Sequence, residues 1–336
     1  MELEQRCKAL AAELNLANPN NVKEVVPLTG GVASDIAVVD LGTRRICMKF
    51  ALPKLKVDAI WQAPVHRSAA EYAWLEVAAK VIPESAIRLF GYSATFHGFA
   101  AEFIEGKDVY LWKDNLLREA PAQNEAAFVA ACLGRIHGAS AQTSFNSTPF
   151  RNRDDFHALR IEPYLVHTRK AHPTLHDQIA PMETMLYEAD RILVHGDVSP
   201  KNILFRKGGP ILLDAECATM GDACFDPSFC LNHLVLKAIH LPTSRERLLA
   251  DVTAFWQAYA AHVTWEDLPA LEARVCALLP VLMLARVDGK SPVEYLSESE
   301  RQTVREVAFP LIAAPVTRIE AFTNRLSQHL VEGAHD

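Results

Sequence analysis

The sequence lacks any apolar segment long enough to cross a membrane. Its longest apolar run, Val275 to Ala285, covers 11 residues and contains Pro280, whereas a membrane-spanning helix needs about 20 apolar residues. The first residues, MELEQRCKALAAEL, are charged and follow a helical period, whereas a secretory signal has an uninterrupted apolar stretch. We therefore expect a cytoplasmic protein that does not bind membranes.

The sequence also has no excess of basic residues and no regular cysteine pattern. Its 336 residues include 34 Lys and Arg against 41 Asp and Glu, a net charge of −7. That sign disfavours binding to the phosphates of nucleic acids or to anionic lipids, so we expect no nucleic-acid partner. The seven cysteines are scattered and no two have C-x-x-C spacing, which favours buried free thiols over a disulfide framework or a metal site.

No internal repeat is visible, but the hydrophobic period changes along the chain. Before residue 106, short Val- and Ile-rich segments separated by turn residues predict strands, and one stretch has the period of a helix. Beyond residue 108 the helical period dominates. The length fits about two units at roughly 150 residues each, which we place at 1–106 and 107–336. The predicted strands are 22–28, 34–41, 44–50, 86–93 and 98–104, and the clearest predicted helices are 68–81, 125–137, 244–262, 268–284 and 316–331.

Two adjacent segments in the second unit, HGDVSPKNIL and ILLDAECATMGDACFD, concentrate oxygen-bearing side chains on brief strand-like runs and loops. They place a carboxylate at Asp197, a carboxamide at Asn202, and further carboxylates at Asp214 and Glu216. Magnesium prefers a few oxygen ligands and keeps water and phosphate in its remaining positions. We therefore expect Asn202, Asp214 and Glu216 to hold Mg²⁺, which leaves Asp197 to orient and deprotonate a hydroxyl group.

With these two segments, the chain resembles the aminoglycoside phosphotransferase and choline kinase superfamily over about 300 residues. The resemblance implies an α+β, protein-kinase-like bilobal fold with a small five-stranded antiparallel N-lobe carrying one helix and a larger, mainly α-helical C-lobe. HGDVSPKN corresponds to the catalytic loop of that family, and Asp214-Ala215-Glu216 replaces the Asp-Phe-Gly of protein kinases. By this template Asp197 is the catalytic base, and Asn202 and Asp214 bind the metal that bridges the phosphates of ATP.

The same template assigns the grip on the nucleotide phosphates to the N-lobe. Lys49, in the third predicted strand, corresponds to the lysine that contacts the α- and β-phosphates. Glu71, on the following helix, is the expected partner of this lysine, with Glu76 on the same helix as the alternative.

Two further N-lobe segments correspond to nucleotide-binding parts of the template. The turn LTGGVASD is not a G-x-G-x-x-G motif, but it precedes a strand as the phosphate-covering turn does in this family, and it places Gly30, Gly31 and Ser34 near the phosphates. Glu102 and Ile104 lie at the junction of the two lobes, where main-chain groups would bind adenine.

Two departures from protein kinases favour a small-molecule hydroxyl acceptor. Gly196 replaces the arginine that follows the catalytic-loop histidine, and no Ala-Pro-Glu follows Asp214, so a phosphorylation-controlled activation loop has no anchor. His233 and Lys237 share one helix face, and Arg286 follows a predicted buried helix; we expect these three to line the acceptor site. The segment around Arg286 loosely resembles 5-methylthioribose kinases, which implies a sugar or methylthioribose-like acceptor; an aminoglycoside or an amino alcohol is the alternative.

The resulting prediction is an ATP- and Mg²⁺-dependent small-molecule kinase. Two other classes stay open. One is a catalytically silent nucleotide-binding protein of the same fold. The other is a metal-dependent phosphoesterase that would use His195, Asp197, Asp214 and His233 but would leave Lys49 without a role. The sequence does not indicate an oligomeric state.

Overall fold

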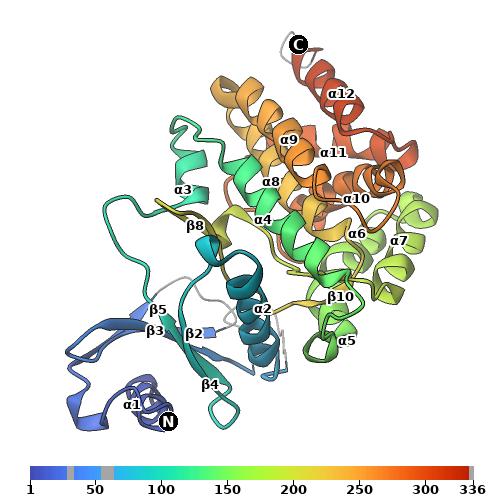
Figure 1. Ribbon diagram of the computed structural model, residues 1–336. Coiled ribbons are helices and arrows are strands. Elements are labelled where there is room, and N and C mark those ends of the chain that lie inside the picture. The colour runs from blue at the N-terminus through green and yellow to red at the C-terminus, as the bar shows by residue number, and fades with distance from the viewer. Residues whose placement is uncertain (29–33, 54–63, 333–336) are drawn as a thin grey trace.

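The computed structural model describes residues 1–28, 34–53 and 64–332 as an α+β protein. A small antiparallel sheet lies at one end of the molecule, and a large group of helices lies at the other (Figure 1). The predicted fold class is confirmed.

The five-stranded sheet has the order β1-β2-β3-β5-β4, with every neighbouring pair antiparallel. The first three strands pair consecutively and form an antiparallel meander. The helix α2 follows them as predicted, and a further helix, α1, forms from the charged N-terminal segment that precedes the sheet. The elements are α1 (Leu3–Glu13), β1 (Glu24–Leu28), β2 (Ser34–Asp40), β3 (Arg45–Ala51), α2 (Arg67–Val81), β4 (Leu89–Ser93) and β5 (Gly98–Glu102).

The alternation of side chains along β3 sets up the two faces of the sheet. Ile46, Met48 and Phe50 point to one face, where they are fully buried in an apolar cluster shared with α1. Lys49 therefore belongs to the opposite face, which packs against α2. Helix α2 also contacts the helical part of the protein and lies between it and the sheet (Figure 1), so it carries side chains to the junction of the two parts.

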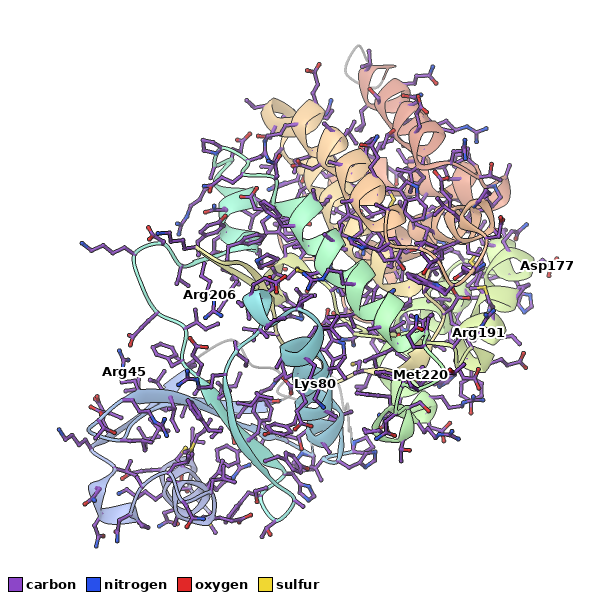
Figure 2. All side chains as sticks on the ribbon, in the orientation of Figure 1. Arg45, Lys80, Asp177, Arg191, Arg206 and Met220 are labelled. Atoms are coloured by element: carbon purple, nitrogen blue, oxygen red, sulfur yellow. The ribbon has the colours of Figure 1, made fainter. Side chains whose placement is uncertain are left out.

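The helical part is built around one apolar cluster that extends from α2 to the C-terminal helix. Side chains fill the space between its ribbons (Figure 2). The predicted helices at 125–137, 244–262, 268–284 and 316–331 are present, with ends shifted by a few residues. The helices are α3 (Trp112–Leu117), α4 (Glu125–Ser140), α5 (Arg153–Phe156), the π-helix η4 (His157–Val166), α6 (His167–Ala171), α7 (His176–Glu188), α8 (Phe225–His240), α9 (Arg245–Ala260), α10 (Leu268–Asp288), α11 (Glu298–Ala313) and α12 (Ile319–Glu332).

Helix α10 is, within the described part of the chain, the one helix whose length and composition would suit a membrane span. It is a core helix, because it packs against α8 and α11 and 67% of its most apolar window is buried inside the fold. Helix α8 is buried along almost its whole length beside it. These two helices bring His233, Lys237 and Arg286 into the interior.

Short strands hold the two segments that concentrate oxygen ligands. The strands β6 (Tyr110–Leu111), β8 (Ile203–Arg206) and β9 (Gly209–Leu212) form a three-stranded sheet, and β7 (Ile192–Val194) pairs with β10 (Thr219–Gly221). Arg206 on β8 forms a 3.0 Å ion pair with Glu102 at the end of β5 and so joins this sheet to the N-terminal one (Figure 2).

Candidate active site

The loop between β7 and β8 is held in place by Asp226 at the start of α8. Its carboxylate accepts the backbone N–H groups of His195 (2.6 Å) and Gly196 (2.9 Å). The His137 ring nitrogen Nε2 lies 3.2 Å from the same carboxylate. These bonds pair buried polar groups that would otherwise be left unsatisfied at the loop, so Asp226 and His137 have a structural role here.

Gly196 is required by the backbone of this loop. Its φ is +79°, and a Cβ atom built on it would lie 2.8 Å from Cys217 Cβ and 2.9 Å from the Cys217 carbonyl oxygen. Positive φ disfavours residues with a Cβ, and backbone atoms cannot easily give way. The loop therefore has no room for the arginine that protein kinases carry at this position.

The ring of His195 supports the loop from inside. Its Nδ1 accepts the backbone N–H of Asp197 at 3.1 Å, so this nitrogen carries no proton. The ring also packs edge-on against Trp74 of α2, with centroids 4.7 Å apart. Burial lowers the pKa of His195, which keeps the imidazole neutral. His195 is thus engaged with the backbone of the loop rather than with Asp214 or His233.

Asp197 is buried between two cations. Its Oδ2 lies 3.0 Å from Arg160 Nη2 and 3.5 Å from Lys201 Nζ. Burial alone would raise the pKa of this carboxyl, but Lys201 and Arg160 outweigh burial, and the pKa falls below its ordinary value. Asp197 is therefore ionised at neutral pH and has a fixed orientation.

Arg160, on the π-helix η4, was not found by sequence reasoning. Its Nη1 donates to the Leu159 carbonyl at 2.7 Å, and its Nε donates to the Gly196 carbonyl. The guanidinium thus binds both the Asp197 carboxylate and the carbonyl of the preceding residue, Gly196. In the sequence, Arg160 is marked only as an arginine within the largely apolar stretch LRIEPYLV. This stretch matches no known motif.

Asn202 and Asp214 are brought together by a backbone hydrogen bond of 2.9 Å from Leu213 N–H to the Asn202 carbonyl. The Asn202 amide nitrogen donates to the Asp197 carbonyl at 3.2 Å, so its side-chain oxygen is the atom left to accept or coordinate. Asp214 has a left-handed backbone with φ +67°, and its side chain is one-third exposed. A carboxylate and an amide oxygen are the donor set that magnesium takes while keeping water and phosphate ligands, so these residues fit the predicted metal.

Lys49 joins the sheet to this site. Its Nζ donates to Glu71 Oε1 at 2.7 Å and also contacts Asp214 Oδ1. The expected Lys49–Glu71 pair is thus present, whereas Glu76 is exposed. Burial raises the pKa of Glu71 to about 7, although Lys49 opposes this effect.

Glu216 has a partner that the sequence did not reveal. Its Oε2 accepts from the Nε of Arg67 at 2.9 Å, and Arg67 is fully buried at the start of α2. Arg67 also donates to the carbonyls of Pro64 and Leu52, each at 2.9 Å. One oxygen of Glu216 therefore couples the loop after β9 to α2, and metal binding by Glu216 stays a prediction.

The other predicted nucleotide contacts lie at the edges of the sheet. Ser34 is buried at the start of β2, while Gly30 and Gly31 lie outside the described residues. Glu102, at the end of β5, contacts Arg206 and the backbone N–H of Arg88. Ile104 is partly buried against the large apolar cluster. Their contacts with a nucleotide stay predictions.

The predicted acceptor residues, His233, Lys237 and Arg286, are all buried. The ring of Phe229 lies 5.6 Å from that of His233 and 5.7 Å from the Arg160 guanidinium. The two helices therefore bring these predicted residues close to the Arg160–Asp197 pair.

With this geometry established, comparison with known proteins identifies the class. The profile of the phosphotransferase enzyme family matches residues 24–271, well over half of the chain. The chain belongs to this family, which confirms the prediction of a kinase-type phosphotransferase. No curated protein sequence matches the chain significantly.

Several solved structures share the fold. An amicoumacin kinase in complex with AMP-PNP, Ca²⁺ and its ligand has a TM-score of 0.55 at 13% identity, with 95% of this chain and 98% of that chain covered. An ethanolamine kinase of Plasmodium vivax has a TM-score of 0.52 at 10% identity, covering 97% and 88%. A putative aminoglycoside phosphotransferase of Ralstonia eutropha JMP134 has a TM-score of 0.52 at 13% identity, covering 96% and 98%. At these identities the likeness establishes the kinase-like fold.

Proposed function

We propose that this protein transfers the γ-phosphate of ATP to a hydroxyl group of a small molecule, with Asp197 as the catalytic base. One observation carries the proposal: Lys49, from the sheet, contacts Asp214, which the loop after β9 places beside Asn202 and Asp197. This set combines a phosphate-binding cation, metal-binding oxygens and a base, as phosphoryl transfer requires. The nucleotide would bind between the parts 1–106 and 107–336.

In the proposed reaction the acceptor oxygen attacks the γ-phosphorus and forms a new P–O bond. The bond from the γ-phosphorus to the β–γ bridging oxygen breaks, and ADP leaves with the electron pair. Asp197 accepts the hydroxyl proton, for which its ionised carboxylate is suited. Arg160 keeps this carboxylate oriented. Lys49, held in position by its ion pair with Glu71, neutralises charge on the α- and β-phosphates.

Asp214 and Asn202 are the residues that would hold Mg²⁺. When bound, the ion would neutralise phosphate charge and align the nucleotide. Asp214 is already in contact with Lys49, so the metal-binding and phosphate-binding groups of the site are adjacent. Ser34 and the predicted turn with Gly30 and Gly31 would cover the phosphates, and Glu102 and Ile104 would flank adenine.

The amicoumacin kinase and the ethanolamine kinase named above support a small-molecule acceptor, since each is named for such a compound. The phosphoesterase hypothesis has less support. Within residues 1–28, 34–53 and 64–332, no group of three or more His, Cys, Asp or Glu side chains is arranged to hold a metal ion. His195, which that hypothesis needs as a ligand, uses its Nδ1 for the backbone of Asp197.

A coupled ADP-release assay tests this function. Wild-type protein is incubated with ATP and Mg²⁺ and with hydroxyl compounds that include sugars, amino alcohols and aminoglycosides, and the product is identified by mass spectrometry. We expect one acceptor class to raise ADP release together with a product heavier by one phosphoryl group. Hydrolysis of a model phosphoester without ATP would instead favour the phosphoesterase, and calorimetry that detects no Mg²⁺-dependent nucleotide binding would favour the silent protein.

A further inference from the structure

Three basic side chains from three helices converge on the loop that follows α10, residues 289–297. Lys113 of α3 pairs with Glu294 of this loop. The Nζ of Lys237, on α8, lies 5.0 Å from the ring centroid of Tyr295. Arg286, in the last turn of α10, donates to the Ser291 hydroxyl at 3.1 Å. We call Lys113, Lys237 and Arg286 the cationic cluster.

Two members of the cationic cluster are buried without a counter-charge. Lys237 is 1% exposed and Arg286 is 9% exposed, and neither forms an ion pair with a carboxylate in the described part of the chain. The Nε of Arg286 and the hydroxyl of Tyr295 are buried polar atoms with no hydrogen-bond partner there. Glu294, the carboxylate of this loop, is already engaged by Lys113.

Two side chains, Tyr164 and Arg160, connect the cationic cluster to the proposed catalytic base, Asp197. Arg286 Nη1 donates to the Tyr164 hydroxyl at 3.2 Å. The guanidinium of Arg160 lies 5.9 Å from the Tyr164 ring, and its Nη2 is the group that contacts Asp197. A small molecule held by Arg286 and Lys237 is therefore near enough to present a hydroxyl to Asp197.

Such burial is costly unless a ligand offsets it. Removing an ammonium or guanidinium group from water costs several kcal/mol when no opposite charge replaces the water. Burial, with Lys113 and Arg286 nearby, lowers the pKa of Lys237 to about 7. Proteins seldom leave buried polar groups unpaired, and an unpaired buried group indicates a functional role or a bound water or ion.

We propose that the acceptor is an anion: a small hydroxylated molecule whose carboxylate or phosphate group binds Lys237 and Arg286 while its hydroxyl faces Asp197. This inference rests on the proposed function. A bound oxyanion would supply the missing counter-charge and would accept from Arg286 Nε and the Tyr295 hydroxyl. An amino alcohol or aminoglycoside would instead place its ammonium groups beside buried cations, which electrostatic repulsion opposes.

The test uses one scaffold in four charge states: glycerol, glycerate, glycerol 3-phosphate and 2-amino-1,3-propanediol. Each compound is titrated calorimetrically into the full-length protein saturated with AMP-PNP and Mg²⁺, so that anions cannot enter the nucleotide site. We expect glycerate and glycerol 3-phosphate to bind at least about tenfold more tightly than glycerol, equivalent to about 1.4 kcal/mol. The aminodiol should bind more weakly than glycerol.

Lys237→Met and Arg286→Gln test the residues, and Lys207→Met is the matched control because Lys207 is an exposed lysine. We expect the first two variants to lose the preference for anions while AMP-PNP binds as in the wild type. The proposal is overturned if the anions bind no better than glycerol, or if Lys237→Met keeps the preference.

Failure of the proposed function has a different signature. If AMP-PNP does not bind, the titrations are repeated without nucleotide on the Lys49→Met variant, in which the phosphate-binding lysine of the sheet is removed. Anion binding that depends on Lys237 would then support the anion site even though the kinase assignment had failed. Anion binding that is absent, or independent of Lys237, would overturn the anion site as well.

Discussion

Arg160 and Asp197 form a buried ion pair, with 3.0 Å between Nη2 and Oδ2, at the centre of the candidate active site. Arg160 comes from a π-helix and Asp197 from the loop after β7. Because Arg160 also binds the Gly196 carbonyl, it fixes both the carboxylate and the backbone that carries it. We therefore treat Arg160 as a residue that positions the base.

Arg160→Met should strongly destabilise the protein. Removing one partner of a buried ion pair typically costs about 3–5 kcal/mol, because the other charge stays buried and unpaired. Chemical denaturation measures the change in the free energy of unfolding. In the Asp197→Asn background the cost of Arg160→Met should be clearly smaller, since no unpaired carboxylate is left. Equal costs in both backgrounds would mean that the ion pair does not cause the effect.

Lys49→Met should weaken the binding of AMP-PNP with Mg²⁺ by at least about tenfold, because a charged hydrogen bond contributes about 1.5–3 kcal/mol. Glu71→Gln should have a smaller effect, since the amide oxygen still accepts from Lys49. Lys80→Met is the control, because Lys80 is an exposed lysine on the same helix as Glu71 (Figure 2). Isothermal titration calorimetry measures all three affinities, and wild-type affinity in Lys49→Met would disprove the phosphate-binding role.

Gly196→Ala should disturb the catalytic loop. The added Cβ would lie 2.9 Å from a backbone oxygen of Cys217, at a φ of +79°, and strained backbone of this kind costs about 1–3 kcal/mol. We expect a lower melting temperature and a loss of transfer activity larger than the loss of nucleotide affinity. A variant with wild-type stability would show that the loop can shift to accommodate a side chain.

Lys237→Met should stabilise the protein in a pH-dependent way. The pKa of Lys237 is about 7 in the folded protein, under the influence of burial, Lys113, Arg286, Glu294 and Cys230, and its ordinary value is higher. Above pH 7 the unfolded chain therefore binds a proton that the folded chain lacks. The loss of folding stability caused by Lys237 is consequently largest at low pH and decreases as the pH rises. The variant's gain in unfolding free energy should be on the order of a few kcal/mol near pH 6 and should decline toward about pH 10.

The opposite dependence, or a loss of stability at every pH, would mean that Lys237 has a stabilising partner. Lys207→Met, at an exposed position, should change the unfolding free energy little over the same range. Measuring the unfolding free energy of these variants as a function of pH needs neither an acceptor nor a nucleotide.

Sequence reasoning predicted those parts of the fold and site that local pattern determines. The third predicted strand and the loop HGDVSPKN gave the positions of Lys49, Asp197 and Asn202 in the chain, and the resemblance to the family template paired Lys49 with Glu71. The partners Arg160 and Arg67 were missed because each pairing joins segments far apart in the chain. A single sequence does not reveal such contacts, and neither arginine lies in a recognisable motif.

The sequence predicted the acceptor residues but not that their charges would be buried without carboxylate partners. His233 and Lys237 were selected because they share one face of an otherwise apolar helix, and Arg286 because it follows a predicted buried helix. Their lack of carboxylate partners in the described part of the chain depends on the packing of α3, α8 and α10, which the sequence does not specify. The packing of these helices therefore makes the region around the predicted acceptor residues positively charged, although the whole chain has a net charge of −7.

The most direct test of the central claim measures transfer of labelled phosphate from γ-labelled ATP to the acceptor found in the ADP-release screen, with wild-type protein and Asp197→Asn side by side. We predict that wild type forms phosphorylated acceptor and ADP in equal amounts. Asp197→Asn should bind AMP-PNP normally and transfer at least about a hundredfold more slowly, the minimum typical of a lost general base. Transfer by Asp197→Asn at the wild-type rate would contradict the account.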